Sequence, residues 1–321
     1  PMETLWPGSG ESKLGLAAKK TARGVGLYRR FNKVIREFQP DVIHFHAFPD
    51  HMDRLDFPRS RMFYSFHAAL ERNLSMLGQK NTALLQSLSD DGLTFCGLTS
   101  DYAKEIGARF HTDRVLCIPN GLDFDRIRSQ RYGREELRSL FGIPEDAFLL
   151  GTVGRLHPVK NQERMLSILW EVQKSRPDAR LLIVGADQAG RADLLRRQAA
   201  ELGVADALVL AGERRDADAI LAAMDCFLMT SHSEALPLVA IEAQVQGVKC
   251  VFSDAVPEDV ACRDCVRLSL DESDEQWAEA VLNASACSGS PKTLDGYNVQ
   301  AIITKLLGVY SGSCGFSRRI P

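Results

Sequence analysis

The 321-residue sequence lacks long apolar runs, a strong excess of one charge and a basic, apolar leader segment. No segment approaches the roughly 20 apolar residues that a membrane-spanning helix needs. The net charge of −3 gives no reason to expect a nucleic-acid partner. A hydrophobic content of 45% with 25% charged residues is that of a globular protein, and the length allows two domains of roughly 150 residues each. We therefore expect a cytoplasmic two-domain protein that binds no nucleic acid.

The motifs of metal sites and of Walker phosphate loops are also missing. The pattern GxxxxGK[ST] is absent. Cys262 and Cys265 have metal or redox spacing, but neither a second CxxC nor a His pair accompanies them. Other cysteines lie in or beside apolar segments, as is typical of reduced, buried thiols: Cys96, Cys117, Cys226 and Cys250. We expect structural thiols, no metal and no cofactor.

The sequence does contain a regular alternation of strand-like and helix-like segments. The expected strands are 41–46, 61–67, 93–98, 115–118, 147–153, 180–184, 207–210, 226–230, 249–252 and 265–268. The expected helices are 24–38, 68–88, one from 99, 161–175, 190–202, 216–224, 237–246, 274–284 and 294–309. This alternation predicts an α/β protein with parallel, doubly wound sheets. The near-continuous apolar runs in the strands agree with burial on both faces.

A charged stretch, residues 124–146, interrupts the alternation and carries Gly142 and Pro144. Glycine and proline punctuate loops, so we place a domain boundary there. The expected division is a Rossmann-like N-terminal domain at 1–142, a second Rossmann-like domain at 143–293, and a last helix with its tail at 294–321.

The N-terminal region is basic, with eight Lys or Arg and three Glu in the first 40 residues. Residues 1–20 are expected to lack regular structure, and residues 24–38 to form an amphipathic helix. The apolar stripe of this helix is Leu27, Phe31, Val34 and Phe38. The basic stretch 13–36 could lie on an anionic membrane surface. The alternative, which we favour, is that the stripe packs on the domain and the basic face is solvated.

Two predicted strands end in histidines. The first contains His44 and His46, and the second ends at His67. In open α/β sheets, ligands collect at the carboxyl ends of the strands. His67 is therefore a candidate for substrate contact, with a structural role as the alternative. The structural role is favoured for His44 and His46.

The segment 231–247 holds two carboxylates, Glu234 in a strand-to-helix loop and Glu242 on the helix that follows. Pro237 can open that helix and Gly247 can close it. The free N–H groups at the helix start, those of Leu238 and Val239, form an anion site. A phosphate held there would have carboxylates beside it that accept hydrogen bonds from sugar hydroxyls. The arrangement fits a nucleotide-sugar pocket, with an ordinary helix entry and solvated glutamates as the alternative.

A second loop places cations at the same sheet edge. The segment 151–161 ends a strand, turns at Gly154 and starts a helix, and it carries Arg155 and Lys160. Arginine offers a planar fork and lysine a mobile point charge, so together they could neutralise a diphosphate. Either residue alone would be an ordinary solvated loop charge.

These segments resemble glycosyltransferase family 4, a family of retaining enzymes with the GT-B fold of two Rossmann-like domains facing a cleft. The resemblance spans about residues 40–310 and rests on four motifs: Val-Gly-Arg-Leu with Lys160-Asn161, Val-Gly-Ala at 184–186, Pro119-Asn-Gly-Leu-Asp123 and the Glu234–Glu242 pair. It is strongest in the second half. The segment from Glu234 to Gln244 and Val251-Phe-Ser-Asp254 are most similar to bacterial exopolysaccharide or capsule glycosyltransferases.

The resemblance implies a metal-independent transfer of a hexose, with retention, from a UDP- or GDP-sugar to a glycan or lipid-linked glycan. Arg155 and Lys160 would bind the diphosphate, Glu234 and His67 the donor sugar, and Glu242 the ribose. The remaining donor-binding positions would be Gly154, Pro237, Leu238 and Val239. Peripheral contact with the inner face of the cell membrane, through residues 13–36, is also compatible with it.

The sequence departs from the family pattern in two places. Ala235 follows the first glutamate where the family usually has glycine. Family members open with a strand and a Gly-Gly loop, whereas about 40 residues without such a strand precede Asp41. We therefore expect an N-terminal domain without its first strand or strands. The alternative function is a relative that binds a nucleotide sugar without turnover. A GT-B epimerase or phosphorylase is a third reading, for which no residues can be assigned.

Overall fold

The computed structural model of the chain describes residues 13–49, 51–129, 132–188, 190–261, 264–284 and 294–312. The chain divides into two compact units. The first consists of the residues up to Cys96 together with Ala103–Leu116. The second consists of Gly97–Tyr102 together with the chain from Cys117 onward. We describe each unit by itself.

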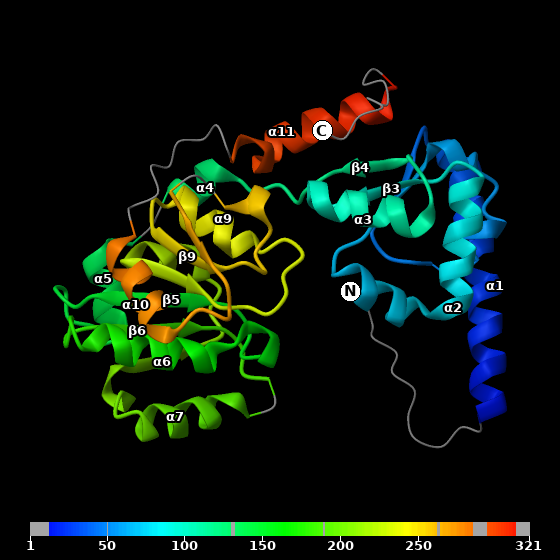
Figure 1. The fold of residues 1–321 in the computed structure, drawn as a ribbon. Coiled ribbons are helices and arrows are strands. Elements are labelled where there is room, and N and C mark those ends of the chain that lie inside the picture. Colours follow the sequence, from blue (N-terminus) through cyan, green and yellow to red (C-terminus); the bar gives the residue numbers. More distant parts are fainter. Residues whose placement is uncertain are drawn as a thin grey trace. The chain divides into compact units, whose positions relative to one another are not determined.

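Within the described residues, the second unit contains a six-stranded parallel sheet (Figure 1). Its strands are β5 (Leu149–Val153), β6 (Arg180–Val184), β7 (Leu208–Gly212), β8 (Cys226–Met229), β9 (Lys249–Ser253) and β10 (Val266–Leu268). They lie side by side in the order β10-β9-β8-β5-β6-β7, and each neighbouring pair is parallel. The strand predictions for the second half are confirmed, because all six strands form where the apolar runs are.

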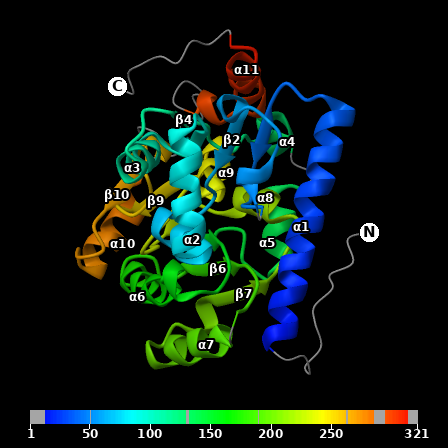
Figure 2. The same ribbon diagram turned by 90° about the vertical axis from the view of Figure 1, so that its right-hand side faces the viewer.

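Helices cover both faces of this sheet (Figures 1 and 2). One face packs against α6 (Gln162–Gln173), α7 (Arg191–Glu201) and α10 (Asp274–Asn283). The other packs against α4 (Phe124–Arg128), α5 (Arg134–Leu140), α8 (Ala217–Ile220) and α9 (Leu238–Val245). Successive strand residues alternate between the two cores, as Leu149 and Leu150 do in β5. This alternation explains why the strands are apolar throughout and confirms the doubly wound arrangement.

The strand order fixes where a ligand site can form. From β5 the chain moves outward through β6 and β7, then returns to β8 on the other side of β5 and moves outward again. The order therefore reverses between β5 and β8, and this is the point of an open α/β sheet at which ligands bind, beyond the carboxyl ends of the strands. The loops that leave β5 and β8 carry the residues predicted to bind the donor.

The first unit is built on shorter strands. They are β1 (Ile43–Phe45), β2 (Met62–Ser65), β3 (Thr94–Gly97) and β4 (Val115–Cys117), in the order β1-β2-β3-β4. The β1–β2 and β2–β3 pairs are parallel. Their helices are α2 (Leu70–Asp90) and α3 (Ser100–Phe110). The buried rings of Phe66, Phe95 and Phe110 contact one another, with centroids 4.6 to 6.1 Å apart. All four predicted strands of this half are confirmed.

The N-terminal helix differs from the prediction in length and in the face that it presents. Helix α1 spans Lys13–Phe38, so it begins well before residue 24. Ala, Leu and Lys are strong helix formers, which explains regular structure in a stretch that looked irregular. Residues 1–12 lie outside the described residues.

The predicted apolar stripe of α1 is exposed. Its four residues are 36–77% accessible: Leu27, Phe31, Val34 and Phe38. The half-buried residues are instead Tyr28, Asn32 and Ile35. Asn32 exchanges two hydrogen bonds of 2.9 Å with the backbone, one with the Arg54 carbonyl and one with the Asp56 amide. The prediction that the stripe packs on the domain is wrong, because polar anchoring selects the neighbouring face of the helix.

Residues 117–142 group with the second unit, whereas the sequence placed the boundary near residue 142. Phe124, Ile127 and Leu137 are buried in the same core as α9.

Helix α11 (Val299–Tyr310) belongs to the same unit, since the backbone of Leu122 hydrogen-bonds to Tyr297 and Val299 on either side. None of the helices in the described ranges has both the length and the apolar character that a membrane crossing requires.

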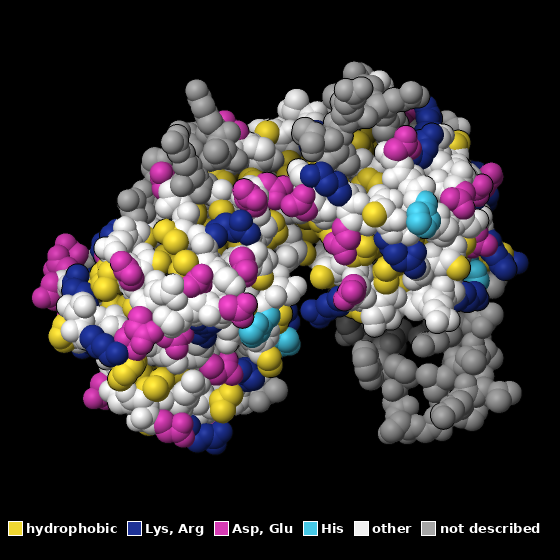
Figure 3. Space-filling view, viewed as in Figure 1, with side chains coloured by type: hydrophobic (Ala, Val, Ile, Leu, Met, Phe, Trp, Pro, Cys, Tyr) yellow, Lys and Arg dark blue, Asp and Glu magenta, His cyan; other side chains and the backbone are white. Residues whose placement is uncertain are grey.

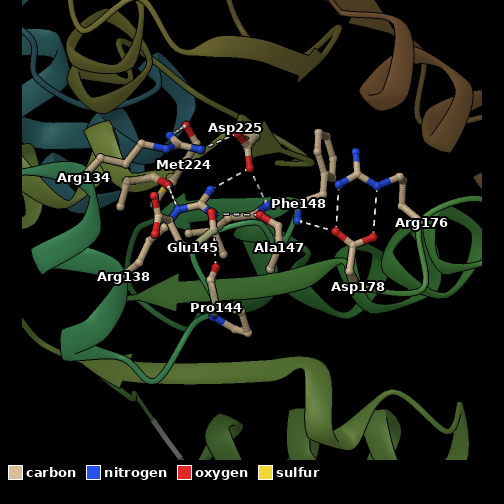
Figure 4. A network of polar contacts seen from close by, with 12 residues as sticks. Arg134, Arg138, Pro144, Glu145, Ala147, Phe148, Arg176, Asp178, Met224 and Asp225 are labelled. Carbon is tan, nitrogen blue, oxygen red and sulfur yellow. Dashed lines mark hydrogen bonds and ion pairs between the residues drawn. The ribbon is translucent and has the colours of Figure 1, made fainter.

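A buried arginine ties α5 to the sheet (Figure 4). The Arg138 side chain is 1% exposed and donates to the carboxylate of Asp225 at 2.7 Å. It also donates to the carbonyls of Ala223 at 3.1 Å and Ala147 at 2.8 Å. Asp225 accepts in turn from the Leu149 amide at 2.7 Å. This network joins the entries of β5 and β8 at the sheet edge opposite the predicted site.

Candidate functional site

The loop after β5 is shaped by its neighbour after β6. The Gly154 amide donates to the Val184 carbonyl at 2.8 Å, and the Leu156 amide donates to the Ala186 carbonyl at 2.9 Å. A Cβ on Gly185 would lie 2.0 Å from the Gly154 carbonyl oxygen, and the φ of Gly185 is +156°. Glycine is therefore required where the two backbones meet. The Val-Gly-Ala motif at 184–186 therefore holds the backbone of the loop after β5 in place.

The same loop then makes a single tight turn before α6. A 3-10 turn spans Pro158–Lys160, and Nδ1 of His157 accepts from the Val159 amide at 3.1 Å. The Gln162 side chain donates to the Arg155 carbonyl at 2.9 Å. The backbone on both sides of Lys160 is thus held in place, and its aliphatic stem lies over Gly154.

The loop after β8 is bound to this turn. The Thr230 hydroxyl donates to the Asn161 carbonyl at 2.8 Å, and the His232 amide donates to the Val159 carbonyl at 2.8 Å. From the β9 side, the Ser253 hydroxyl donates to the Ser231 carbonyl at 2.7 Å. Adjacent strands therefore deliver two loops that are fastened to each other, as the switch-point geometry predicts.

These ties bring Lys160 and Glu234 together. The Lys160 Nζ lies 2.6 Å from Oε1 of Glu234, and the two side chains are 21% and 10% exposed. The sequence predicted both residues at one sheet edge, but not that they would form an ion pair. Arg155 is exposed, and its guanidinium makes a 3.3 Å contact with the Gln188 side chain.

Helix α9 begins as the sequence predicts. Pro237 occupies the N-cap, and the first helical backbone bond runs from the Ala240 amide to the Pro237 carbonyl at 3.0 Å. The amides of Leu238 and Val239 precede that bond, so the helix itself offers them no carbonyl acceptor. Gly247, with a φ of 76°, follows the helix at the other end.

Glu242 lies one turn into α9, and its carboxyl group interacts electrostatically with Arg126 and Asp218, which form an ion pair with each other. The two atoms of that pair, Nη1 of Arg126 and Oδ2 of Asp218, are 2.6 Å apart. Burial raises the pKa of Glu242, Asp218 raises it further, and Arg126 opposes both. One turn later, Gln246 donates to the carbonyls of Ile127 and Asp218.

The sequence analysis did not predict Arg126 and Asp218 as residues near the candidate site. The only sequence signal for Arg126 is that it follows the Pro119–Asp123 turn, whose Asp123 caps α4 by accepting from the Arg126 amide at 3.0 Å.

In the first unit, three histidines meet where β1 and β2 end. Nδ1 of His46 lies 2.9 Å from Nε2 of His67, so one ring donates to the other. The His44 ring stacks on that of His46 with centroids 4.4 Å apart, and its Nε2 lies 2.8 Å from the Ser65 hydroxyl. Burial, followed by the charge of His46, lowers the pKa of His67. The sequence predicted the edge at which these rings lie, but not their contact.

The stability of the first unit should depend on pH through His44. Burial, His46 and His67 lower the pKa of His44 from 6.5 to about 4. As the pH falls from 7 to 5, the unfolded chain takes up a proton at this residue and the folded one does not, so stability is lost. We expect the His44→Gln variant to lose about 1–2 kcal/mol less than the wild type over this range, measured by urea unfolding. Replacing the exposed His111 by Gln is the control; an equal reduction there would contradict the assignment.

A surface cavity lies elsewhere on the second unit. It measures about 680 Å³, between α6, α7 and the start of α10, and Glu163, Glu171 and Glu272 are among its lining residues. That face carries acidic and basic side chains next to one another (Figure 3). None of the sequence-predicted site residues lines the cavity within the described ranges. Its acidic lining does not suit a diphosphate, so we place the candidate site at the β5 and β8 loops.

Candidate metal ligands and thiols can be located in the described part of the chain. There, no group of three or more His, Cys, Asp or Glu side chains is arranged to hold a metal ion. The described cysteines are buried or half-buried: Cys96, Cys117, Cys226, Cys250 and Cys265. Cys262, and with it the CxxC pair, lies outside the described residues.

Comparison with known families covers nearly the whole chain. The family described as Glycosyl transferases group 1 matches residues 133–297, which is more than half of the sequence. The family described as Glycosyltransferase Family 4 matches residues 5–126. The two matches correspond to the two halves that the sequence motifs indicated.

Individual proteins similar to this chain are also named as glycosyltransferases. EpsF of Bacillus subtilis (strain 168) is 32% identical over 210 residues, 62% of this chain and 54% of EpsF. The UDP-Gal:alpha-D-GlcNAc-diphosphoundecaprenol alpha-1,3-galactosyltransferase of Escherichia coli is 25% identical over 209 residues, 61% of this chain and 54% of that enzyme. The chain spans about half the length of the curated relatives it matches.

Solved structures show the same fold. HepE of Anabaena, crystallised with UDP, matches with a TM-score of 0.74 at 19% identity, over 89% of this chain and 82% of HepE. A glycosyltransferase of Rickettsia africae matches with a TM-score of 0.76 at 13% identity, over 96% of this chain and 83% of that one. These similarities confirm the GT-B class of fold, with two α/β units.

Proposed function

Since the chain belongs to the group 1 glycosyl transferases, we propose that it moves a sugar from a nucleotide-diphosphate sugar to an acceptor, with the donor bound at the β5 and β8 loops. The observation that carries the proposal is the junction of these loops at the switch point. It gathers Arg155, Lys160, Glu234 and the start of α9 in one unit. HepE, a structure of the same fold, was crystallised with UDP, which supports a nucleotide site.

Each residue has a role that follows from its chemistry. Arg155 and Lys160 neutralise the diphosphate, and the amides of Leu238 and Val239 bind its phosphate oxygens. Glu234 accepts hydrogen bonds from the donor sugar. Glu242, half-buried on α9, accepts them from the ribose hydroxyls.

The chemical step breaks the bond between the anomeric carbon and the phosphate oxygen. The acceptor oxygen forms the new bond to that carbon, and its proton passes to the departing diphosphate. Negative charge grows on the diphosphate as the bond breaks, so cations fixed beside it stabilise the transition state more than the ground state. We propose that Arg155 and Lys160 supply this stabilisation without a metal. Retention, by attack on the face from which the diphosphate leaves, and a hexose as the sugar are part of the same proposal.

We further propose that His67 contacts the donor sugar and that the acceptor is a glycan or a lipid-linked glycan. The name of the Escherichia coli relative describes a diphosphoundecaprenol-linked substrate, which supports a lipid-linked acceptor. Contact with an anionic membrane surface through residues 13–36 is compatible with the exposed stripe of α1 and its basic neighbours Arg29, Arg30 and Lys33. Cosedimentation with anionic vesicles tests that contact.

The donor site is tested by a thermal-shift panel of UDP- and GDP-sugars. We expect one donor, at about 100 times its dissociation constant, to raise the melting temperature by about 3–8 °C. The Glu242→Ala variant should lose this shift, because the ribose hydroxyls lose their acceptor. Donor hydrolysis is then measured for the donor that binds.

Glu279→Ala is the matched control, since Glu279 is exposed on α10. The control should keep the full shift. A shift that survives in Glu242→Ala would contradict the role of Glu242, and the absence of any shift would contradict the donor site. Binding without hydrolysis, even with acceptors present, would favour the alternative of a nucleotide-sugar-binding relative without turnover.

A further inference from the structure

Lys160 and Glu234 form an ion pair inside the candidate donor site. We propose that Glu234, through this pair, makes the site discriminate the nucleotide sugar from the free nucleoside diphosphate. The inference rests on the proposed function, which assigns the diphosphate to Lys160 and the sugar to Glu234. The observation behind it is the 2.6 Å separation of Nζ and Oε1, with side chains that are 21% and 10% exposed.

The ion pair gives Glu234 a counter-charge in a largely buried position. A carboxylate that is removed from water is stable only when it is paired. The Lys160 ammonium is a compact point charge with three donors, so it can contact a diphosphate while it remains near Glu234. The carboxylate and the diphosphate then share one cation, and they repel each other across a partly buried site.

The two ligands feel this repulsion differently. A free nucleoside diphosphate ends in a phosphate monoester, which carries more negative charge than the diester of a nucleotide sugar and has no sugar hydroxyls. A nucleotide sugar places hydroxyl donors beside Glu234, and the carboxylate accepts their hydrogen bonds. Glu234 therefore opposes the product and favours the substrate. Specificity commonly uses such a repulsive element together with an attractive one.

The different effect of Glu234 on the nucleotide sugar and on the free nucleoside diphosphate also bears on product release. Once the sugar has been transferred, Glu234 has lost its hydroxyl partners and faces only the diphosphate. Glu234 then keeps the Lys160 ammonium as its counter-charge as the diphosphate leaves. The pair thus promotes product release and limits product inhibition.

The test is isothermal titration of UDP, GDP and their sugar conjugates into the wild type and Glu234→Gln. Glutamine keeps the shape of the side chain and removes its charge. We expect the variant to bind the nucleoside diphosphate about tenfold more tightly and the nucleotide sugar about tenfold more weakly, so that the ratio of the two dissociation constants shifts about 100-fold. The gain for the diphosphate should shrink at high salt, because it is electrostatic.

Two further variants keep the test interpretable. Glu171→Gln removes the carboxylate from a Lys–Glu pair of the same 2.6 Å length on α6, formed with Lys174, and should leave the ratio unchanged. Glu234→Asp retains the charge and should bind the nucleoside diphosphate within about threefold of the wild type. Tightening in Glu234→Asp equal to that in Glu234→Gln would attribute the effect to packing and would overturn the inference.

The outcomes also separate this inference from the proposed function. If the wild type binds a nucleotide sugar but Glu234→Gln leaves the ratio unchanged, the discrimination is refuted and the donor site stands. If the wild type binds no nucleotide or nucleotide sugar of the panel, both are refuted.

Discussion

Replacing Arg138 by Met is expected to lower the free energy of unfolding of the second unit by about 3–5 kcal/mol. The guanidinium is fully buried and serves Asp225 and several backbone carbonyls at once (Figure 4). Methionine matches its volume but provides no donors, so the carbonyls of Ala223 and Ala147 lose their partner. The Asp225 carboxylate keeps Arg134 and the Leu149 amide but loses its most buried cation.

Urea unfolding followed by tryptophan fluorescence measures this effect, since the fully buried Trp277 lies in the same unit. Arg176→Met is the control, and Arg176 is also shown in Figure 4. Arg176 pairs with Asp178 at 2.7 Å, but both side chains are about 40% exposed (42% and 41%), so little change is expected. An Arg138→Met variant no less stable than this control would show that the network does not stabilise the fold.

Replacing Lys160 by Met is expected to lower kcat/KM for sugar transfer about 100- to 1,000-fold, which corresponds to about 3–4 kcal/mol of transition-state stabilisation. Methionine keeps an apolar side chain over Gly154 and removes the charge beside the proposed diphosphate. Because negative charge grows on the diphosphate during the reaction, kcat should fall by more than KM rises. Steady-state kinetics with the donor identified by the thermal-shift panel measure both constants.

Lys174→Met is the matched control for this experiment. Lys174 also pairs with a glutamate at 2.6 Å, and its ammonium lies 3.9 Å from the centroid of the Trp170 ring, away from the loops of the candidate site. Its activity should stay within about twofold of the wild type. Activity of Lys160→Met above about a tenth of wild type would mean that this lysine does not carry the proposed role. The melting temperature of each variant shows whether it is folded.

The sequence predicted strands more reliably than it predicted the surface of helices. A strand buried on both faces is apolar at every position, so β5, β6 and β8 could be located from composition alone. A helix needs only one apolar face, and α1 shows that the most apolar face is not always the one that packs. The hydrogen bonds of Asn32 to residues more than 20 positions away decided its orientation, and no local pattern reports such contacts.

The charged stretch 124–146 is a second case in which the local pattern did not predict which residues pack. It contains α4 and α5, whose few apolar residues, Phe124, Ile127 and Leu137, are buried in the core of the second unit. The high charge of the stretch, together with Gly142 and Pro144, led the sequence analysis to expect a loop where these short helices form. Composition measures how polar a segment is on average, whereas membership of a unit depends on a few buried contacts.

The sequence by itself determined the class of fold, the strand positions and the kinds of residue in the candidate site, because each of these follows from local pattern and residue chemistry. Arg155, Lys160, Glu234 and the start of α9 could all be named before any coordinates. Only the tertiary structure decided that Lys160 and Glu234 form an ion pair, that Arg126 and Asp218 interact electrostatically with Glu242, and that His46 contacts His67. The partners in these contacts are between 21 and 116 positions apart in the chain, and only the pairing of strands and the packing of helices brings them together.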